Sequence, residues 1–420
     1  MVVREVHEPE NPLSSPHLLL VVLAAIQFVH VLDFVVVMPL GAHLMKALSI
    51  GPTSLAAFTS AYNFAAAASG LAGAWWLDRF NRKTALLVTL AGFGVGTLAC
   101  AFSFSAETLT AARFVTGCFG GIIQALLFAI IGDSFREEYR GFATGIVVSA
   151  FSLASIAGVP ISLWFAERFD WRSPFLGLAA LTALIAVATW RLFPRVPSGV
   201  QASSGATLSP LGESRSTLQL IFDSNSMVGF LLIILLMFSG FTVIPFMSAY
   251  LVTNVGLNES DLPLVFLVGG FATLFTSQLA GTLSDRFGKP TVFAWLAGLS
   301  ILPILALTHL GHTRLVCALA VTTLFTVLVS GRSVPALAMI TSSVESSSRG
   351  RYLSLTSCIQ QIASGLASLI TGLFLTLNPD GTMANYERAG VFSSVCAALA
   401  IVVSRKLKQK ETGPRSLSKI

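Results

Sequence analysis

The chain has 420 residues, of which 54% are hydrophobic and only 11% are charged. A soluble domain would carry about a quarter charged residues, so this composition excludes the soluble globular classes. Long stretches, such as 17–32 and 84–102, contain no Asp, Glu, Lys or Arg. The chain is therefore predicted to cross a lipid bilayer many times.

The N-terminal segment and the cysteines further restrict the kind of membrane protein that the sequence can encode. The apolar stretch that begins at His17 is too long for a signal peptide, and no small-residue cleavage site follows it, so we expect a retained membrane helix. The five cysteines lie in apolar segments without a CxxC pair, and we expect neither a disulfide framework nor a metal site. The net charge of +6 is expected to reflect basic cytoplasmic loops rather than a nucleic-acid partner.

Apolar runs of about 20 residues predict twelve membrane-spanning helices. Residues 194–223, which are rich in Ser, Gly and Pro, separate six of them from the other six and are predicted to be a cytoplasmic linker. We thus expect an all-α membrane protein with six-helix bundles in residues 1–193 and 224–420, the second followed by a cytoplasmic tail. The spans are expected to begin near His17, Thr53, Thr84, Glu107, Gly141, Ser173, Ser224, Asp261, Pro290, Arg314, Gly350 and Ala384.

The basic residues indicate the orientation of this topology. Of the 26 Lys and Arg residues, 19 fall on the side that holds both termini, 5 fall on the opposite side and 2 lie inside spans. Cytoplasmic loops of membrane proteins are enriched in Lys and Arg. Both termini are therefore predicted to be cytoplasmic.

The two halves of the chain repeat a motif. Residues 74–83 read AWWLDRFNRK and residues 281–289 read GTLSDRFGK, so that Asp78 and Asp285 are 207 positions apart. A second echo, an Arg-Gly pair at the start of a span, occurs at Arg140 and at Arg349. Matching features at half the chain length imply two similar bundles, which is a transporter architecture.

With these motifs the chain resembles the major facilitator superfamily, whose signature between helices 2 and 3 is roughly G-x-x-x-D-R/K-x-G-R/K-R/K. The first copy has Ala74 and Asn81 in place of the two glycines, whereas the second copy keeps both as Gly281 and Gly288. The resemblance covers nearly the whole chain. It implies the major facilitator fold of two pseudo-symmetric bundles, small-molecule transport and a monomer. The chain looks closest to bacterial drug/proton antiporters and sugar-efflux members, which implies the bacterial cytoplasmic membrane.

In helix 5 the resemblance to antiporters is partial. Gly158 and Pro160 match the antiporter motif, but Ser162 and Leu163 stand where that motif is followed by glycines. The departure leaves the direction of transport open. Pro160 with Gly158 still predicts a bend in this helix.

The repeated motif predicts two conformational latches between the bundles. Asp78 should lie near the start of helix 11, and Asp285 near the start of helix 5, where a helix dipole and free amides stabilise a carboxylate. The alternative is that Asp-Arg-Phe only marks a helix end with basic residues. The other residues assigned to the latches are Arg79, Arg82, Lys83, Arg140, Arg286 and Arg349.

Helix 1 carries the acidic residue that lies deepest in a span. Gln27, His30 and Asp33 follow one another at spacings of three, so they share a helix face that should line the central cavity. An ionisable group inside the membrane is a functional candidate. We expect Asp33 to carry a proton, the alternative being a carboxylate fixed permanently to an arginine or to a helix end. His30 is either a relay member or a hydrogen-bonded core histidine.

Arg113 in helix 4 opens a pattern that resembles a second family motif, an arginine followed by small residues, which is linked to proton coupling. Arg113 and Gly117 match that motif, and Gly117 with Gly121 forms a face for close helix packing. Because helices 1 and 4 are neighbours in this fold, Arg113 is the expected partner of Asp33. The alternative is that Arg113 snorkels to the outer interface.

Arg332 in helix 10 has no acidic residue inside the spans of its own half. We expect it either to pair with Asp33 across the cavity or to contact an anionic substrate group, the alternative being a cation held by helix carbonyls. Gln361 belongs to a polar stripe of helix 11 that either binds substrate or bonds between helices. The remaining candidates for substrate contact are Gln27, Phe34, Gln124 and Phe241.

The sequence contains no P-loop, nucleophile elbow or metal-ligand cluster. We therefore expect no enzyme activity and no cofactor, and transport energised by an ion gradient or by the substrate. The leading prediction is proton-coupled efflux of a small amphipathic molecule by alternating access. The alternative is a transporter of an amphipathic anion or lysolipid whose head group is held by Arg332, and a third possibility is a non-transporting sensor on the same fold.

Overall fold

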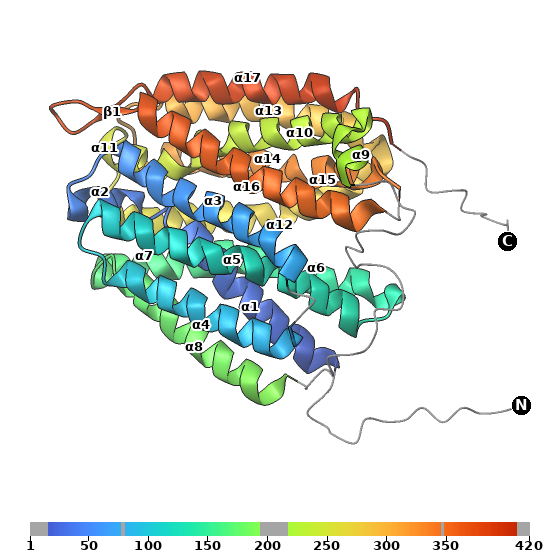
Figure 1. Cartoon of the computed structure of the whole chain (residues 1–420). Helices are drawn as coiled ribbons and strands as arrows, with labels where there is room; N and C mark the ends of the chain where they lie inside the picture. The colour runs from blue at the N-terminus through green and yellow to red at the C-terminus, as the bar shows by residue number, and fades with distance from the viewer. Residues whose placement is uncertain (1–15, 77–79, 194–216, 346–347, 410–420) are drawn as a thin grey trace, which may run out of the picture.

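The computed structural model describes residues 16–76, 80–193, 217–345 and 348–409, and this part of the chain is almost entirely helical (Figure 1). Eleven helical segments within it are long and apolar enough to cross a membrane. The twelfth expected span is α3 (Pro52–Trp76). Its 25 residues are long enough to cross a bilayer, although its sequence is rich in Ala, Ser and Thr.

Helices of the first half begin within a few residues of their predicted starts. Local signals fix these starts: Asn81 caps α4, and Ser105 with Thr108 forms a capping box at α5. The elements are α1 (Pro16–Val36), α2 (Gly41–Leu48), α3, α4 (Arg82–Ala101), α5 (Ala106–Ser134), α6 (Glu137–Leu153), the π-helical turn η3 (Ala154–Gly158), α7 (Val159–Arg168) and α8 (Ser173–Leu192).

The second half repeats the arrangement. Of the predicted linker, residues 194–216 lie outside the described residues, and its last part forms the short helix α9 (Thr217–Phe222). The elements that follow are α10 (Ser224–Phe241), η4 (Ile244–Phe246), α11 (Met247–Thr253), η5 (Glu259–Asp261), α12 (Leu262–Phe287), α13 (Lys289–Thr308), α14 (Leu315–Gly331), α15 (Ser333–Ser342), α16 (Arg349–Phe374), the hairpin strands β1 (Thr376–Leu377) and β2 (Met383–Ala384), and α17 (Tyr386–Ser404).

Three of the spans are interrupted along their length. The π-helical turn η3 stands between α6 and α7, directly before Pro160, where the sequence predicts a bend. The span that starts with α10 is broken after Phe241 by a segment that contains Pro245, and α14 gives way to α15 at Arg332. Such breaks change the direction in which later side chains of the same span project.

The bundle has two unlike ends. Helix α1 begins and α17 ends at the right of Figure 1; we call this the terminal end. Helices α2 and α11 and the β1–β2 hairpin lie at the left of Figure 1, which we call the distal end.

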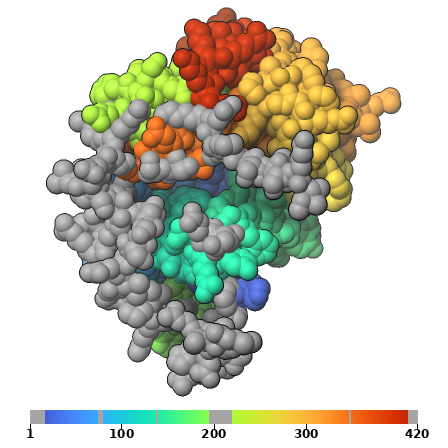
Figure 2. All heavy atoms as spheres, turned by 90° about the vertical axis from the view of Figure 1, so that its right-hand side faces the viewer, coloured from blue at the N-terminus to red at the C-terminus, as the bar shows by residue number. Residues whose placement is uncertain are grey.

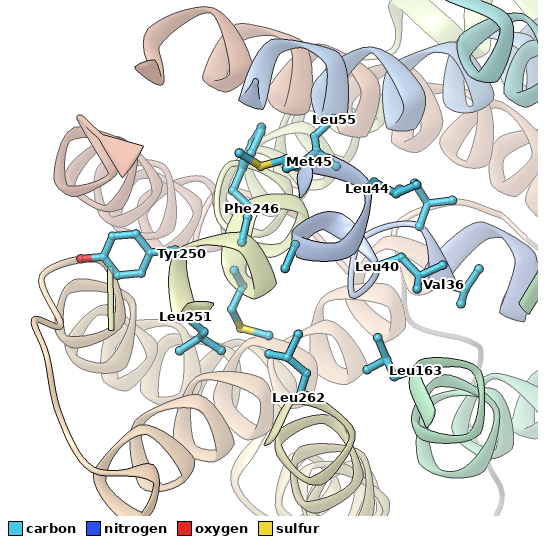
Figure 3. Packing of buried hydrophobic residues seen from close by; sticks show 14 of the residues in the cluster. Val36, Leu40, Leu44, Met45, Leu55, Leu163, Phe246, Tyr250, Leu251 and Leu262 are labelled. Atoms are coloured by element: carbon cyan, nitrogen blue, oxygen red, sulfur yellow. The ribbon is translucent and has the colours of Figure 1, made fainter. Parts of the chain in front are cut away.

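At the distal end one hydrophobic core joins the two halves of the chain. Residues of the first half, such as Leu44 and Leu55, belong to the same buried cluster as Phe246, Leu251 and Leu262 of the second half. Figure 3 shows several of these side chains packed around the ends of their helices. Burial of apolar surface from both halves therefore closes the bundle at this end.

Toward the terminal end the two halves keep separate cores. One buried cluster draws only on residues between Leu20 and Phe193, and another only on residues between Leu220 and Leu407. Seen from this end, the orange atoms of the second half and the teal atoms of the first half are parted by a hollow (Figure 2). The structure is thus closed at the distal end and open at the terminal end.

Close backbone contacts between α3 and α16 mark how far the closed zone extends. Thr53 donates a 2.9 Å hydrogen bond from its Oγ1 to the carbonyl of Gly372, and Ser60 donates a 2.8 Å bond from its Oγ to the carbonyl of Gly365. A Cβ atom placed on Gly372 would lie 2.3 Å from the Cβ of Ala56. Both glycines therefore permit an approach that a larger residue would prevent.

Candidate functional site

A buried ion pair lies where the sequence predicts it. The Nη1 of Arg113 on α5 lies 2.6 Å from the Oδ2 of Asp33 on α1, and Thr97 on α4 donates a 3.0 Å hydrogen bond to the other carboxylate oxygen. The side chains of Asp33 and Arg113 are 0% and 1% exposed. The predicted pairing is confirmed, and the alternative in which Arg113 snorkels to the interface is wrong.

Glycines of α5 allow α3 to press against the ion pair. A Cβ on Gly117 would lie 2.4 Å from the carbonyl oxygen of Tyr62, and a Cβ on Gly121 would lie 2.1 Å from that of Ala66. This contact sets the Tyr62 ring 4.5 Å from the Cζ of Arg113, within the range of a cation–π interaction. The sequence signal for this role of Tyr62 is the glycine spacing on the facing helix, since its aromatic character alone is not distinctive among 31 Phe and 5 Tyr residues.

Burial makes each charge of the ion pair depend on the other. Asp33 has a counter-charge and a hydroxyl donor, while the Nε of Arg113 has no hydrogen-bond partner within the described chain. Removing one partner of a buried pair costs about 3–5 kcal/mol, because the other charge is left uncompensated. A proton on Asp33 would therefore force Arg113 toward other partners, which requires a change of structure around α1 and α5.

A polar column runs from the ion pair toward the terminal end, and we define it as Gln27, His30, Tyr62 and Gln124. The Nε2 of Gln27 on α1 donates a 3.4 Å hydrogen bond to the Oε1 of Gln124 on α5. One turn farther along α1, the His30 Nε2 lies 3.4 Å, and the Tyr62 Oη 2.4 Å, from the position that a Cβ on Gly120 would occupy. The predicted polar face of α1 therefore meets polar groups of α3 and α5.

Several polar atoms of the column are buried without a hydrogen-bond partner among the described residues. They are the Gln27 Oε1, the His30 Nδ1 and the Tyr62 Oη. A buried polar group left without a partner costs about 1–3 kcal/mol. The expectation of a hydrogen-bonded core histidine is thus not met at the Nδ1 of His30.

Two aromatic candidates of the sequence analysis meet across the halves. The ring centroids of Phe34 on α1 and Phe241 on α10 are 6.1 Å apart, and Phe34 lies 5.4 Å from Tyr62. Both separations fall in the range of favourable aromatic pairs. Phe34 and Phe241 thus form an apolar contact beside the polar column.

The polar stripe of α16 bonds mainly within its own helix. Ser364 donates to the carbonyl of Gln360 at 2.8 Å, and Ser368 donates to that of Ser364 at 3.0 Å and to that of Phe241 at 3.5 Å. Gln361 is partly exposed. These contacts favour a packing role for the serines, and substrate contact at Gln361 stays a prediction.

The structure does not bring Arg332 to Asp33, and that predicted pairing is wrong. The Nη1 of Arg332 donates a 2.8 Å hydrogen bond to the Oγ of Ser300 on α13, and its Nη2 donates a 2.9 Å bond to the Oγ of Ser239 on α10. Ser393 on α17 donates in turn to the carbonyl of Ser239. The guanidinium therefore lies among helices of the second half, whereas Asp33 is already paired with Arg113.

Contact between Arg332 and an anionic substrate group stays a prediction. The burial and the hydrogen bonds of Arg332 leave little of its guanidinium available to a substrate. Arg332 is 1% exposed, and two of its three guanidinium nitrogens bond to serines. It caps the C-terminal end of α14, where free carbonyls favour a cation. The alternative of a cation held by helix carbonyls is met only in part, because the partners of the guanidinium are the hydroxyls of Ser239 and Ser300.

The latch candidates that the structure describes lie at the terminal end. Asp78 and Arg79 lie outside the described residues. Arg82 forms a 2.9 Å ion pair with Asp133 of its own half, and Asp285 is exposed. Two of the remaining candidates bond within the first half: Lys83 donates to the carbonyl of Phe193, and Arg140 donates to that of Phe135. In the second half, Arg286 lies over the Phe287 ring, and Arg349 is the first residue of α16. The latches stay predictions for another conformation.

An ionic cluster at the distal end was not predicted. Glu259 of η5 lies 3.0 Å from the Nζ of Lys46 and 3.2 Å from the Nε2 of His43, and both partners lie on α2 of the other half. Burial lowers the pKa of His43 below its usual value; Glu259 and Glu167 oppose this shift, and Lys46 reinforces it. We call His43, Lys46 and Glu259 the distal ionic cluster. Glu259 lies more than 200 positions from His43 and Lys46, and no pattern in the sequence connects them.

The sequence also matches a known family. The sequence model of the Major Facilitator Superfamily matches residues 23–368 and 229–418, and the chain belongs to this superfamily. Its members are membrane transporters, and we describe the chain as a multi-pass membrane transporter of this class. The predicted family and fold are confirmed.

The individual relatives and solved structures share only limited sequence identity with this chain. The MFS-type transporter YhcA of Bacillus subtilis is 24% identical over 66% of this chain and 61% of its own length. The efflux pump dotC of Dothistroma septosporum is 32% identical over 39% of this chain and 28% of its own. Two solved structures share the fold: a bacterial homologue of the human lysosomal transporter Spinster in an inward-facing, unoccupied conformation (TM-score 0.75, 18% identity, 95% of this chain and 100% of that one) and a D-xylose-proton symporter (TM-score 0.76, 14% identity, 94% and 98%).

Proposed function

We propose that this chain is a proton-coupled efflux transporter that exchanges protons for a small amphipathic molecule. The observation that carries the proposal is the fully buried Asp33–Arg113 pair, 2.6 Å across, which is the only carboxylate–arginine pair buried on both sides among the described residues. A titratable group held inside a transporter helix is suited to exchange a proton. The relation to a protein named an efflux pump agrees with outward transport.

Transport would proceed by rocking of the two six-helix halves. In the present conformation the halves are joined by the distal core and are separate toward the terminal end. The opposite conformation would break the distal core and the distal ionic cluster, and would close the terminal end. Asp78 and Asp285 are then expected to reach the starts of α16 and α6 and to act as latches.

The coupling follows from competition for one carboxylate. A proton and the guanidinium of Arg113 cannot both neutralise Asp33, so each proton that binds releases Arg113 from its partner. Because Phe34 directly follows Asp33 on α1, a shift of this segment would also change the contact of Phe34 with Tyr62 and Phe241. His30, one turn away, would pass the proton between Asp33 and the terminal end.

The orientation proposed for the chain follows the distribution of basic residues. Of the 26 Lys and Arg residues, 19 fall in segments that the predicted topology places on the side of both termini, and the positive-inside rule makes that side cytoplasmic. The structure would thus be open toward the cytoplasm. For a bacterial chain the membrane would be the cytoplasmic membrane, with the protein acting as a monomer.

A flux experiment tests the coupling. The purified full chain is reconstituted in proteoliposomes, and accumulation of 4-nitrophenyl β-D-glucopyranoside, an uncharged amphipathic probe, is followed after a pH gradient is imposed. The chain is expected to accumulate the probe against its gradient, and Asp33→Asn is expected to equilibrate the probe without accumulation. Accumulation by Asp33→Asn at the level of the unchanged chain would contradict the proton-carrier role.

Two further variants separate coupling from folding. Asp33→Glu keeps the charge and should retain part of the accumulation. Asp170→Asn removes an exposed ion pair with Arg172 and should leave accumulation unchanged. Thermal stability of each variant in detergent shows which of them are folded.

A further inference from the structure

The polar column and the charges around it point to the chemical class of the ligand. The atoms of the column without partners are an amide oxygen, an imidazole nitrogen and a phenol hydroxyl, contributed by Gln27, His30 and Tyr62. Gln27 and His30 retain 6% and 7% exposure, and Gln124 is partly exposed. Together these side chains offer both hydrogen-bond donors and acceptors.

Among the residues that the structure describes, no free charge is found next to these groups. Asp33 is bonded to Arg113 and Thr97 and is fully buried, so its charge is neutralised inside the protein. Arg332 is directed toward Ser239 and Ser300 in the other half. Other charged residues lie at the ends of spans or in loops of the sequence. A charged ligand placed at the column would lose its water without gaining a counter-charge.

An apolar wall completes the site. The Phe34 ring packs against Tyr62 and against Phe241, so an aromatic or aliphatic group beside the column would meet the rings of Phe34 and Phe241 from opposite halves of the molecule. Ligand sites generally combine such apolar walls with a few polar groups that fix orientation.

We propose that the polar column binds an uncharged molecule that carries an apolar or aromatic part and several hydroxyl or amide groups, with its polar groups bonded to Gln27, His30 and Gln124 and its apolar part against Phe34 and Phe241. The proposal rests on the proposed transport function and names its substrate class. An uncharged ligand leaves the Asp33–Arg113 pair free to respond to protons alone. Charge on the ligand would otherwise compete for that pair.

A matched set of probes tests the class. Binding of three compounds to the full chain in detergent is measured by calorimetry: 4-nitrophenyl β-D-glucopyranoside, which is uncharged, its glucuronide, an anion, and its 2-amino-2-deoxy analogue, a cation. The uncharged probe is expected to bind at least about tenfold more tightly than either charged one. Equal or tighter binding of a charged probe, or no binding of the uncharged probe, overturns the proposal.

Variants locate the binding to the column. Gln124→Leu and Gln27→Leu should each weaken binding of the uncharged probe by about tenfold, the value of one hydrogen bond. Gln278→Leu, the same change at an exposed glutamine of α12, should not weaken it. If all three variants bind equally well, the column is occupied by water only and the proposal is wrong.

The flux experiment distinguishes a failure of the proposed ligand class from a failure of the proposed transport function. Preferential binding of the uncharged probe without pH-driven accumulation would contradict proton-coupled transport and leave the ligand class standing. Accumulation driven by a pH gradient, but with the charged probes transported as well as the uncharged one, would contradict the ligand class and leave the transport function standing.

Discussion

Two buried arginines, one in each half of the molecule, are stabilised in different ways. Arg113 has a carboxylate partner, Asp33, at 2.6 Å, whereas Arg332 donates only to the hydroxyls of Ser239 and Ser300. Both side chains are 1% exposed. The cost of burying the cation is therefore met by an opposite charge in the first half and by hydroxyl and carbonyl dipoles in the second.

The difference assigns unlike roles to the two halves. In the proposed mechanism Asp33 takes up a proton, and its electrostatic attraction to Arg113 is then lost. The serine partners of Arg332 do not titrate in the physiological range, so its contacts are indifferent to pH. The first half is thus expected to respond to protons, and the second half to serve as a fixed counterpart against which it moves.

The largest expected effect comes from Asp33→Asn. It leaves Arg113 buried without a counter-charge and should lower the free energy of unfolding by about 3–5 kcal/mol. Adding Arg113→Gln should recover much of this loss, because two neutral amides can bond to each other. Denaturation of the single and double variants in detergent measures both values. If the double variant is no more stable than the single one, the two charges are not coupled.

Arg332→Met is expected to have a smaller effect. It removes two hydrogen bonds to Ser239 and Ser300 but leaves no unpaired charge, so the loss should be about 1–3 kcal/mol. The pH dependence of transport should be unchanged. The comparison between the two arginines fails if Arg332→Met shifts that pH dependence as Asp33→Asn does.

Gly121→Ala tests the packing that surrounds the first ion pair. The new Cβ would lie 2.1 Å from the carbonyl of Ala66, so α3 and α5 must move apart at a cost of about 1–3 kcal/mol. Gly145→Ala on α6 meets no atom within 4 Å and is the matched control. Equal thermal stabilities of the two variants would show that the close contact of α3 with α5 is dispensable.

The smallest effect is expected at the distal ionic cluster. Burial lowers the pKa of His43 in the closed state, and its usual value near 6.5 returns when the distal end opens. The closed state therefore binds the proton less well: its advantage is present above about pH 6.5 and declines as the pH falls through that value. The effect should stay within about 1 kcal/mol.

A pair of spin labels on α2 and α11 can follow this opening. Acidification should increase the fraction with widely separated labels, and His43→Gln should remove the dependence. An opening fraction in His43→Gln that still rises on acidification would assign the effect to another group.

The sequence predicted the first ion pair more fully than its surroundings. Asp33 is the one acidic residue deep in a span, and few partners existed for it, so the pairing with Arg113 followed from the neighbouring positions of their helices. Thr97 had no such signal, and Tyr62 had only the glycine spacing of the facing helix, because many aromatic and hydroxyl side chains occur in the spans. Their roles depend on which helix faces approach one another, which the glycines of α5 determine.

Arg332 shows why the second site was not predicted. Its predicted contacts followed from the lack of an acidic residue in the spans of its own half. The structure satisfies the guanidinium with the hydroxyls of Ser239 and Ser300 instead, and serines are too common in the spans to be singled out as partners. The distal ionic cluster was not predicted for a different reason, since its residues come from separate halves of the chain and no local pattern connects them.

Infrared difference spectroscopy of the reconstituted chain tests the central claim most directly. Acidification from mildly alkaline to mildly acidic buffer should produce the carbonyl stretching band of a newly protonated carboxylic acid in a dry environment. The band should be present in Arg332→Met and absent in Asp33→Asn. Its presence at full intensity in Asp33→Asn would contradict the assignment of Asp33 as the proton carrier.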